Sequence, residues 1–184
     1  MSGQTEIQLV ERFQNGDETA FNEIVLRYQE RVYWIARRYV GSHDDADDIV
    51  QEVFVRAYEA LHSFRKDAAV ATWLYRIAVN QSINALRWRR VRSALRLDEL
   101  TSDQASSEET PQEALESGER RRLIEEAVAR LPEKQRAVFV LRYYQELSYE
   151  EIAKTLKTSI GGLKANYFHA VKKIQEFMRD AEQS

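Results

Sequence analysis

Residues 148–173, SYEEIAKTLKTSIGGLKANYFHAVKK, carry the clearest fold signal in the chain. Ser148, with Glu151 three residues later, forms a capping box that marks a helix start, and apolar residues then recur at four-residue steps from Ile152. A short helix, a turn at residues 157–159 and a longer helix are the arrangement of a helix-turn-helix unit. The stretch therefore predicts such a unit, with a helical hairpin that binds no DNA as the alternative.

The start of the second helix in this unit is the part that would enter the major groove of DNA. A helix N-terminus can accept a phosphate, and lysines further along the helix can reach the DNA backbone. The candidate contacts with duplex DNA are Ser159, Lys164, Ala165, Asn166, Phe168, Lys172 and Lys173.

Two further helices, separated at Pro132, precede the helix-turn-helix unit. Residues 119–184 are therefore expected to form a second domain of four helices. The predicted core residues of the two preceding helices are Val138, Phe139 and Leu141.

Residues 97–118 are acidic, rich in Ser and Thr, and contain no Lys or Arg. Because few of their side chains are large and apolar, they cannot bury enough surface to fold alone, which is typical of a linker. The sequence therefore predicts two small helical domains, residues 1–96 and 119–184, joined by a flexible acidic linker over 97–118 that lets them move independently.

The first domain has helix stops at Asn15-Gly16 and at Gly41-Ser42. The helix after the second stop opens on an acidic cluster, which complements the helix dipole. Its residues predicted to face inward are Ile49, Val53, Ala57 and Leu61. The opposite face contains Asp48, Gln51, Glu52, Arg56 and Glu59. Taken alone, this polar face is most simply a solvated surface.

The segment 64–96 is basic, although the whole chain has a net charge of -3. Charge is therefore segregated along the chain, and aromatic residues are interleaved with the basic ones. Trp73, Ile77, Ile83 and Leu86 are predicted core residues. Tyr75, Arg76, Asn80, Arg87, Arg89 and Arg90 are predicted to offer stacking surfaces, hydrogen bonds and charge to nucleic acid. The alternative is a solvated basic helix end with Trp88 tucked against the body.

The composition favours an all-α fold. Hydrophobic residues make up 43% of the 184 residues, whereas six Gly and two Pro leave little material for turns. With no Cys and three scattered His, neither a cofactor nor a metal site is expected. The first residues lack the basic start of a signal peptide, and no apolar run approaches a membrane span, so a cytoplasmic protein without membrane insertion is expected.

Three segments and the acidic linker, taken in order, resemble the extracytoplasmic-function (ECF) group of bacterial sigma-70-type sigma factors. The segments are DDADDIVQEVFVRAY (44–58), FRKDAAVATWLYRIAVN (64–80) and LPEKQRAVFVLRYYQELSYEEIA (131–153). The resemblance spans nearly the whole chain. It implies that residues 1–96 are sigma region 2, a helical bundle, and that residues 119–184 are sigma region 4, without an intervening region three.

The function implied by this resemblance is transcription initiation. Such a factor binds core RNA polymerase, directs it to specific promoters and promotes promoter melting, while the polymerase performs the chemistry and the factor is not an enzyme. An anti-sigma factor is a further implied partner, and the flexible linker would permit a compact inhibited state.

The resemblance also implies residue roles. Docking on core RNA polymerase would use Asp45, Asp48, Gln51 and Glu52. Melting of the minus-ten element, with capture of an unstacked base of the non-template strand, would use Phe64, Arg65, Lys66, Thr72, Tyr75, Arg76, Asn80, Arg87, Arg89 and Arg90. Within this set, Phe64, Thr72, Tyr75, Arg76 and Asn80 are the pocket candidates, and Arg87, Arg89 and Arg90 would hold the DNA backbone. The duplex contacts named above would read the minus-thirty-five element.

The helix-turn-helix departs from the usual family pattern. That pattern has Gly near Lys157, Thr at Gly162, a Ser-Arg pair at Ala165-Asn166 and commonly Arg at His169. The missing arginines remove possible guanine contacts worth roughly 1–3 kcal/mol each. We therefore expect Lys164, Lys172 and Lys173 to set affinity, with Asn166 or Phe168 adding limited base preference.

Two other functions compete with this reading. A stand-alone helix-turn-helix regulator would explain the second domain but not the acidic and basic faces of the first. A nuclease would need magnesium held by Asp44, Asp45, Asp47, Asp48 and Glu52. These carboxylates lie on one short helical stretch, whereas metal catalysis normally gathers ligands from several elements.

Overall fold

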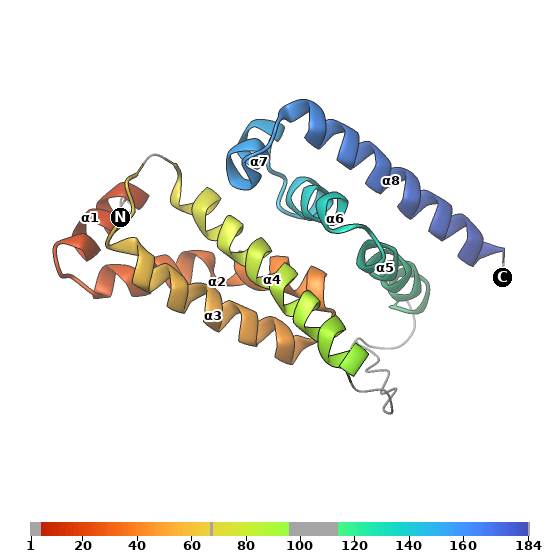
Figure 1. Cartoon of the computed structure of the whole chain (residues 1–184), viewed down its shortest axis with the longest axis horizontal. Coiled ribbons are helices and arrows are strands. Elements are labelled where there is room, and N and C mark those ends of the chain that lie inside the picture. Colours follow the sequence, from red (N-terminus) through yellow and green to blue (C-terminus); the bar gives the residue numbers. More distant parts are fainter. Residues whose placement is uncertain (1–4, 67, 96–113, 184) are drawn as a thin grey trace.

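The computed structural model describes residues 5–66, 68–95 and 114–183, and these ranges contain helices and no strand (Figure 1). The first lobe consists of α1 (Glu6–Gln14), α2 (Thr19–Val40), α3 (His43–Leu61) and α4 (Val70–Leu95). The second lobe consists of α5 (Ala114–Ala129), α6 (Glu133–Phe139) with the π-helical turn η1 (Val140–Tyr144), α7 (Tyr149–Leu156) and α8 (Ile160–Glu182). The predicted all-α class is confirmed.

Local signals set the helix ends of the first lobe. The turn after α1 contains Gly16 at φ 96°, and Gly41 ends α2 at φ 78°, both in the left-handed region that glycine adopts without strain. Ser42 then caps α3 by accepting a hydrogen bond from the Asp45 amide. The inward face predicted for α3 is confirmed, since the four residues Ile49, Val53, Ala57 and Leu61 are buried.

The buried face of α4 differs from the prediction. Its buried residues are Val70, Leu74, Tyr75, Ala78, Val79 and Ser82. The four predicted core residues Trp73, Ile77, Ile83 and Leu86 are instead partly buried. Apolar residues occur on several sides of this helix, which packs against α2 and α3 on one side and against α7 on another. Periodicity therefore could not select one face.

The second lobe follows its sequence signals closely. Ser148 and Glu151 form the predicted capping box at the start of α7, and α7 ends at Lys157, which adopts the left-handed conformation at φ 52°. Ser159 caps α8 by accepting a hydrogen bond from the Gly162 amide at 3.2 Å. The predicted core residues Val138, Phe139 and Leu141 are buried. A helix-turn-helix unit is thus present.

The predicted linker is longer than the segment between the helices. Residues 97–113 lie outside the described residues, but 114–118 belong to α5. Ala, Leu and Glu in this stretch are strong helix formers, so α5 begins earlier than the acidic composition indicates.

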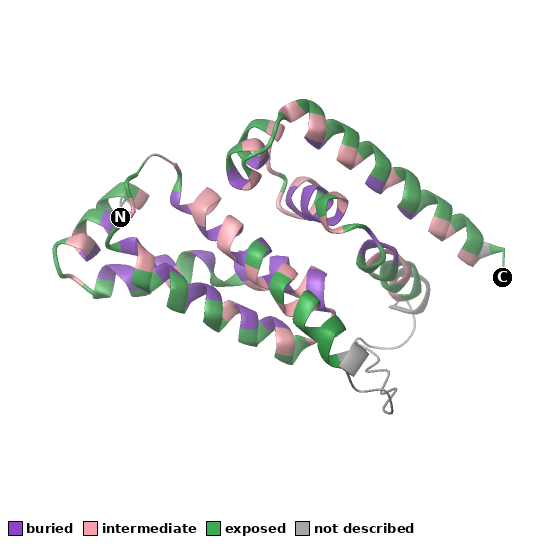
Figure 2. Cartoon of the chain, in the orientation of Figure 1, coloured by how far each residue is buried: buried purple, intermediate pink, exposed green. Residues whose placement is uncertain are grey.

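The two lobes pack against each other. Helix α7 contacts α4, and α5 and η1 contact α2, so both α4 and α2 meet the second lobe (Figure 1). Buried residues line the facing sides of the helices, whereas the outward face of α8 is largely exposed (Figure 2). None of the helices in the described ranges combines the length and apolar character that crossing a bilayer requires.

Candidate nucleic-acid interface

The acidic face of α3 is open to solvent. Asp48, Gln51 and Glu52 are exposed, and Glu52 pairs with Arg56 one turn later at 2.6 Å. Helix α3 lies on the side of the first lobe away from α5–α8 (Figure 1). Asp45 is likewise paired, with Arg89 of α4, and its side chain is 42% exposed compared with 47% for Glu52. All four predicted polymerase contacts are therefore at least partly accessible.

Three predicted DNA contacts, which we call the α4 stripe, follow one side of α4: Arg76, Asn80 and Arg87. Asn80 comes four residues after Arg76 and Arg87 seven after Asn80, intervals of about one and two helical turns. Arg87 makes two hydrogen bonds to Glu133 of α6, with Nε at 3.2 Å and Nη2 at 2.8 Å from its carboxylate oxygens. Arg87 therefore contacts the second lobe, whereas Asn80 is exposed and Arg76 is partly buried.

Tyr75 is a correction to the predicted pocket. Its side chain is 1% exposed, its hydroxyl accepts a hydrogen bond from Arg31 at 3.3 Å, and its ring packs edge-on against Tyr28. The prediction that this ring offers a stacking surface is wrong for this structure, since it belongs to the core of the first lobe.

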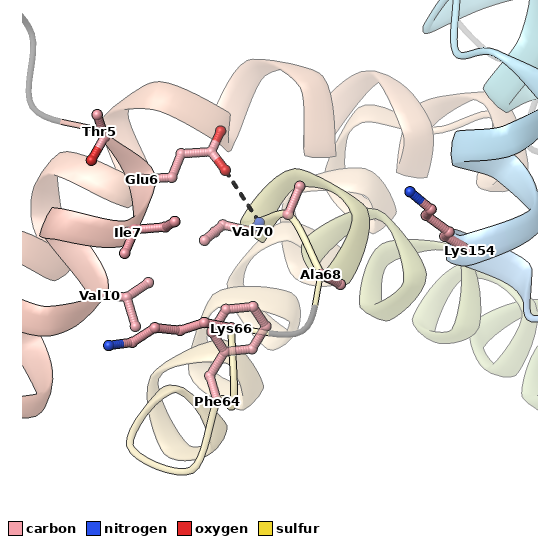
Figure 3. Close-up of a pocket in the computed structure, with 10 residues that line it drawn as sticks. Thr5, Glu6, Ile7, Val10, Phe64, Lys66, Ala68, Val70 and Lys154 are labelled. Carbon is pink, nitrogen blue, oxygen red and sulfur yellow. Dashed lines mark hydrogen bonds between the residues drawn. The ribbon is translucent and has the colours of Figure 1, made fainter.

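A cavity of about 490 Å³ opens where α1 meets the loop before α4 (Figure 3). Phe64 lines it and packs against Trp73, with 5.0 Å between the ring centroids and the ring planes tilted by 44°. Lys66, also at the wall, adopts φ 58° and pairs with Glu11 at 2.9 Å. Of the predicted pocket residues, this cavity thus includes Phe64, whereas Thr72, Arg76 and Asn80 lie further along α4.

Sequence reasoning missed the other wall of this cavity. Glu6 of α1 accepts a hydrogen bond from the Val70 amide at 3.2 Å and so fixes the first turn of α4 (Figure 3). The α1 residues at the wall are Thr5, Glu6, Ile7 and Val10. Lys154 of α7 also reaches the cavity from the second lobe. No local motif marks these residues, although exposed Ile7 in an otherwise amphipathic helix is a weak signal.

The basic end of α4 combines engaged arginines with an exposed aromatic ring. Arg87 pairs with Glu133, and Arg89 pairs with Asp45 while donating to the Val40 carbonyl at 3.3 Å. Trp88 between them is 67% exposed, so the alternative in which it is tucked against the body is wrong. Arg90 is also exposed. The hydrogen bonds from Arg87 lower the pKa of the Glu133 carboxyl.

The start of α8 presents an exposed surface. Lys164, Ala165 and Phe168 are exposed, Phe168 to 65%, and the Lys164 ammonium lies 5.8 Å from the centre of the Tyr149 ring. Asn166 instead donates to the Gly162 carbonyl at 2.8 Å, which occupies one of its amide hydrogens. Lys172 and Lys173 are exposed further along, with Lys172 3.8 Å from Glu176.

The carboxylates of α3 do not assemble a metal site. In the described part of the chain, no three His, Cys, Asp or Glu side chains are grouped so that they could hold a metal ion. Asp45 is paired with Arg89 and Glu52 with Arg56, which leaves the nuclease alternative without its ligand set.

Comparison with known proteins matches each lobe to a separate family model. The Sigma-70 region 2 family model matches residues 24–92, and the Sigma-70, region 4 model matches residues 121–174. The ECF RNA polymerase sigma-E factor of Escherichia coli (strain K12) is 42% identical over 173 residues, covering 90% of each chain.

Two solved structures share the fold. The structure of CnrH in complex with the cytosolic domain of CnrY matches with a TM-score of 0.70 at 24% identity, covering 94% of this chain and 96% of that one. The sigma factor RpoE in complex with the anti-sigma factor NepR from Bartonella quintana matches with a TM-score of 0.67 at 23% identity, covering 86% and 96%.

Both lobes, their order and their spacing are shared with these relatives, which a stand-alone helix-turn-helix regulator would not explain. The chain belongs to the ECF group of sigma-70-type RNA polymerase sigma factors and directs RNA polymerase to promoters.

Proposed function

We propose that three helices of the chain each bind a different partner during transcription initiation. Helix α3 docks on core RNA polymerase through Asp48, Gln51 and Glu52, with Asp45 joining when Arg89 releases it. Helix α4 stabilises the melted minus-ten element, and α8 grips the minus-thirty-five duplex. The chain supplies no catalytic group, and it acts in the cytoplasm, where bacterial RNA polymerase meets promoter DNA. Residues 1–96, which include α3 and α4, and residues 119–184, which include α8, are the two functional domains.

The observation that carries this proposal is the placement of an exposed acidic face on α3 beside the basic, aromatic end of α4, to which the Asp45–Arg89 pair connects it. An acidic face suits a protein partner rather than DNA, because DNA phosphates repel carboxylates. Exposed Trp88 between arginines suits nucleic acid, because bases stack on aromatic rings while arginines pair with phosphates. One chain thus carries surfaces for both partners.

Base capture is assigned to the region around Phe64, Lys66 and the α4 stripe. Extruding a base costs a few kcal/mol of unstacking, which a site must offset with stacking and hydrogen bonds. The Phe64 and Trp73 ring pair supplies an aromatic wall, and Thr72, Arg76 and Asn80 supply hydrogen-bonding groups on the adjoining helix. Arg65 and Arg90 supply positive charge for the strand backbone, as do Arg87 and Arg89 once Glu133 and Asp45 release them.

Upstream binding is assigned to the exposed start of α8. Ser159 is committed to the helix cap, and one Asn166 amide hydrogen to the Gly162 carbonyl, so neither is fully available to a base. Lys164, Lys172 and Lys173 therefore provide most of the affinity through phosphates, and exposed Phe168 provides an apolar contact such as with a thymine methyl group.

An anti-sigma factor is a further proposed partner. RpoE of Bartonella quintana, which shares the fold, was crystallised with the anti-sigma factor NepR. The contact between the two lobes of the present chain would offer such a partner a compact form to hold.

Run-off transcription with bacterial core polymerase, with and without the chain, on a pool of upstream regions tests the proposed division. The wild type is expected to give specific transcripts. A variant with Asp48→Lys and Glu52→Lys is expected to lose polymerase binding, whereas Glu59→Lys, an exposed charge reversal later on α3, serves as the matched control. If the double variant still bound polymerase like the wild type, the docking assignment would be wrong.

A further inference from the structure

Helix α1 holds the turn that follows α3. The side-chain Nε2 group of Gln14, the last residue of α1, donates hydrogen bonds to the carbonyls of Leu61 and Phe64, at 3.0 Å each. A weaker hydrogen bond of 3.4 Å reaches the His62 carbonyl. The last carbonyls of a helix have no partner within the helix, so a donor from another element fixes the direction in which the chain leaves it. Gln14 therefore positions the backbone that carries Phe64.

A second contact from α1 reaches further along the connection between α3 and α4. Glu11, about one turn before Gln14, forms an ion pair with Lys66 at 2.9 Å. Lys66 adopts the left-handed conformation at φ 58°, which is unfavourable for a residue with a Cβ atom. Such a conformation persists where neighbouring groups hold it in place, and the Glu11 carboxylate is one such group. Helix α1 thus supports the backbone geometry of this connection at Lys66.

The third contact fixes the start of α4. Glu6, in the first turn of α1, accepts a hydrogen bond from the Val70 amide at 3.2 Å, and its other carboxylate oxygen accepts one from the Tyr28 hydroxyl of α2. The first amides of a helix have no partner within the helix, and a carboxylate complements the helix dipole there. Glu6 therefore caps α4 from a distant part of the sequence and holds its first turn against α1 and α2.

Helix α1 is itself anchored in the core of the first lobe. Leu9, Val10 and Phe13 are at most 1% exposed, and the Phe13 ring packs against the His62 ring with 4.5 Å between the centroids. Segments with many buried apolar contacts open less readily than loops. The three polar contacts therefore join the connection between α3 and α4 to a well-anchored helix.

The cavity of about 490 Å³ lies between this helix and the connection that it holds (Figure 3). Ile7 and Val10 line the cavity from α1, and Phe64, Ala68 and Ala69 line it from the connection. Ile7 is 55% exposed, so a large apolar side chain is open to an incoming group at this wall. Since α1 forms one wall and positions the other, the fit of a group between the walls depends on the three polar contacts.

From these contacts we infer that α1 is a specificity element for the minus-ten sequence: it forms one wall of the pocket for the extruded base and sets the position of the opposite wall. Glu6, Glu11 and Gln14 are positioning residues, because they act through the connection that carries Phe64 and not through contact with the base. The inference rests on the proposed capture of a base beside Phe64. It extends base selection to α1, where the sequence predicted no DNA contact.

Transcription by the complete holoenzyme tests this role of α1. Core polymerase with the full chain is given a promoter that the wild type transcribes, together with every single-base change of its minus-ten element. At each position, the amount of run-off transcript from the preferred base, divided by that from the least favoured base, gives a base ratio. Phe64→Ala identifies the position of the captured base, because loss of the aromatic wall is expected to lower the base ratio there.

Two variants of α1 are then compared at that position. Gln14→Met, which keeps the length and neutrality of the side chain but removes its donor, is expected to lower the base ratio roughly tenfold, the discrimination that one base position ordinarily carries. Glu11→Gln is expected to lower it about threefold, because a half-exposed ion pair contributes less. Base ratios at the other positions are expected to stay unchanged.

Gln29→Met, on an exposed glutamine of α2, is the matched control and is expected to leave every base ratio unchanged. Urea denaturation checks that each variant is folded. Should Gln14→Met not fold, Glu11→Gln decides the outcome, because it changes a residue at the surface.

The inference is overturned if Phe64→Ala lowers a base ratio and neither α1 variant lowers it, even where both reduce transcription from all promoters equally, which is the sign of a merely structural role. An equal fall of the base ratios at every minus-ten position also overturns it. Failure of the proposed function looks different. In that case the wild type gives no specific transcript with core polymerase, or Phe64→Ala leaves every base ratio unchanged.

Discussion

Helices α4 and α8 both carry proposed DNA contacts, but the free chain presents them differently. Helix α4 is apolar on several sides and contacts the second lobe, with Arg87 and Arg89 held by carboxylates. Helix α8 lies at the edge of the second lobe with its outward face exposed, and Lys164 is one of its exposed cations (Figure 2). The difference teaches that α8 presents exposed cations at the edge of its lobe, whereas two arginines of α4 are shared with carboxylates of α3 and α6.

The strongest test of the role proposed for α4 removes two residues of the α4 stripe together. Arg76→Ala with Asn80→Ala is expected to lower the rate of promoter opening roughly 100-fold, because two polar contacts of about 1.5 kcal/mol each are lost. Permanganate footprinting with core polymerase measures the opening. Asn22→Ala, an exposed asparagine on α2, is the matched control. Normal opening by the double variant would remove α4 from the melting role.

A second test loosens the contact that Arg136 of α6 makes with α2. Arg136→Ala is expected to lower the free energy of unfolding by about 3 kcal/mol, because buried carbonyls lose a charged donor. Urea denaturation followed by circular dichroism measures the change. Lys134→Ala, an exposed cation on the same helix, should change stability by less than about 0.5 kcal/mol. Equal effects of the two substitutions would show that Arg136 is not a structural donor.

The role proposed for α8 is tested through the salt dependence of its binding to duplex DNA. Lys164→Ala is expected to weaken binding to all upstream sequences by the same factor, roughly fivefold, and to reduce the salt slope by about one. Fluorescence anisotropy with several duplexes over a salt series measures both quantities. Arg179→Ala, an exposed cation near the far end of α8, is the control. A loss confined to some sequences would mean that Lys164 reads bases.

The smallest expected effect concerns the cap that positions α7 and, through it, α8. Glu151 accepts hydrogen bonds from the Ser148 amide at 2.7 Å and hydroxyl at 2.8 Å, which lower its pKa below the ordinary value of 4.5. A lowered pKa stabilises the fold above the ordinary value, and that stabilisation is lost as pH falls through the lowered one. Glu151→Ala should therefore lower the free energy of unfolding by about 1 kcal/mol at neutral pH and by progressively less as the pH falls.

Urea denaturation of wild type and variant across a pH series measures this cost. Glu150→Ala, on the neighbouring exposed residue, is the control for general loss of negative charge near the helix start. A Glu151→Ala cost that stayed constant between neutral pH and strong acid would show that the carboxylate does not act as the cap.

Features fixed by neighbouring residues could be predicted from the sequence. The Ser148–Glu151 cap, the helix end at Gly41 and the inward face of α3 all depend on short spacings, and all three are present. The buried face of α4 could not be predicted, because Leu74, Tyr75 and Ile77 place apolar side chains around the helix. Only packing decides which of them is buried, and it placed Tyr75 in the core.

The candidate site was predictable to a similar degree. Exposed positions on α3 and α8 follow from helical periodicity. The α1 wall of the cavity, the reach of Lys154 and the hold of Glu133 on Arg87 join residues distant in sequence. Such long-range contacts leave no local spacing that a single sequence can reveal.

Three polar atoms buried between the two lobes have no hydrogen-bond partner within the described residues. Each such atom costs about 1–3 kcal/mol of lost hydration, which returns when water reaches it. Arg38 Nε, Tyr39 Oη and Arg136 Nε thus subtract from the free energy that favours closure. A ligand must favour one of two forms by only about 5.5 kcal/mol to invert a 99:1 population. A lobe contact weakened in this way requires less free energy from a binding partner to be broken.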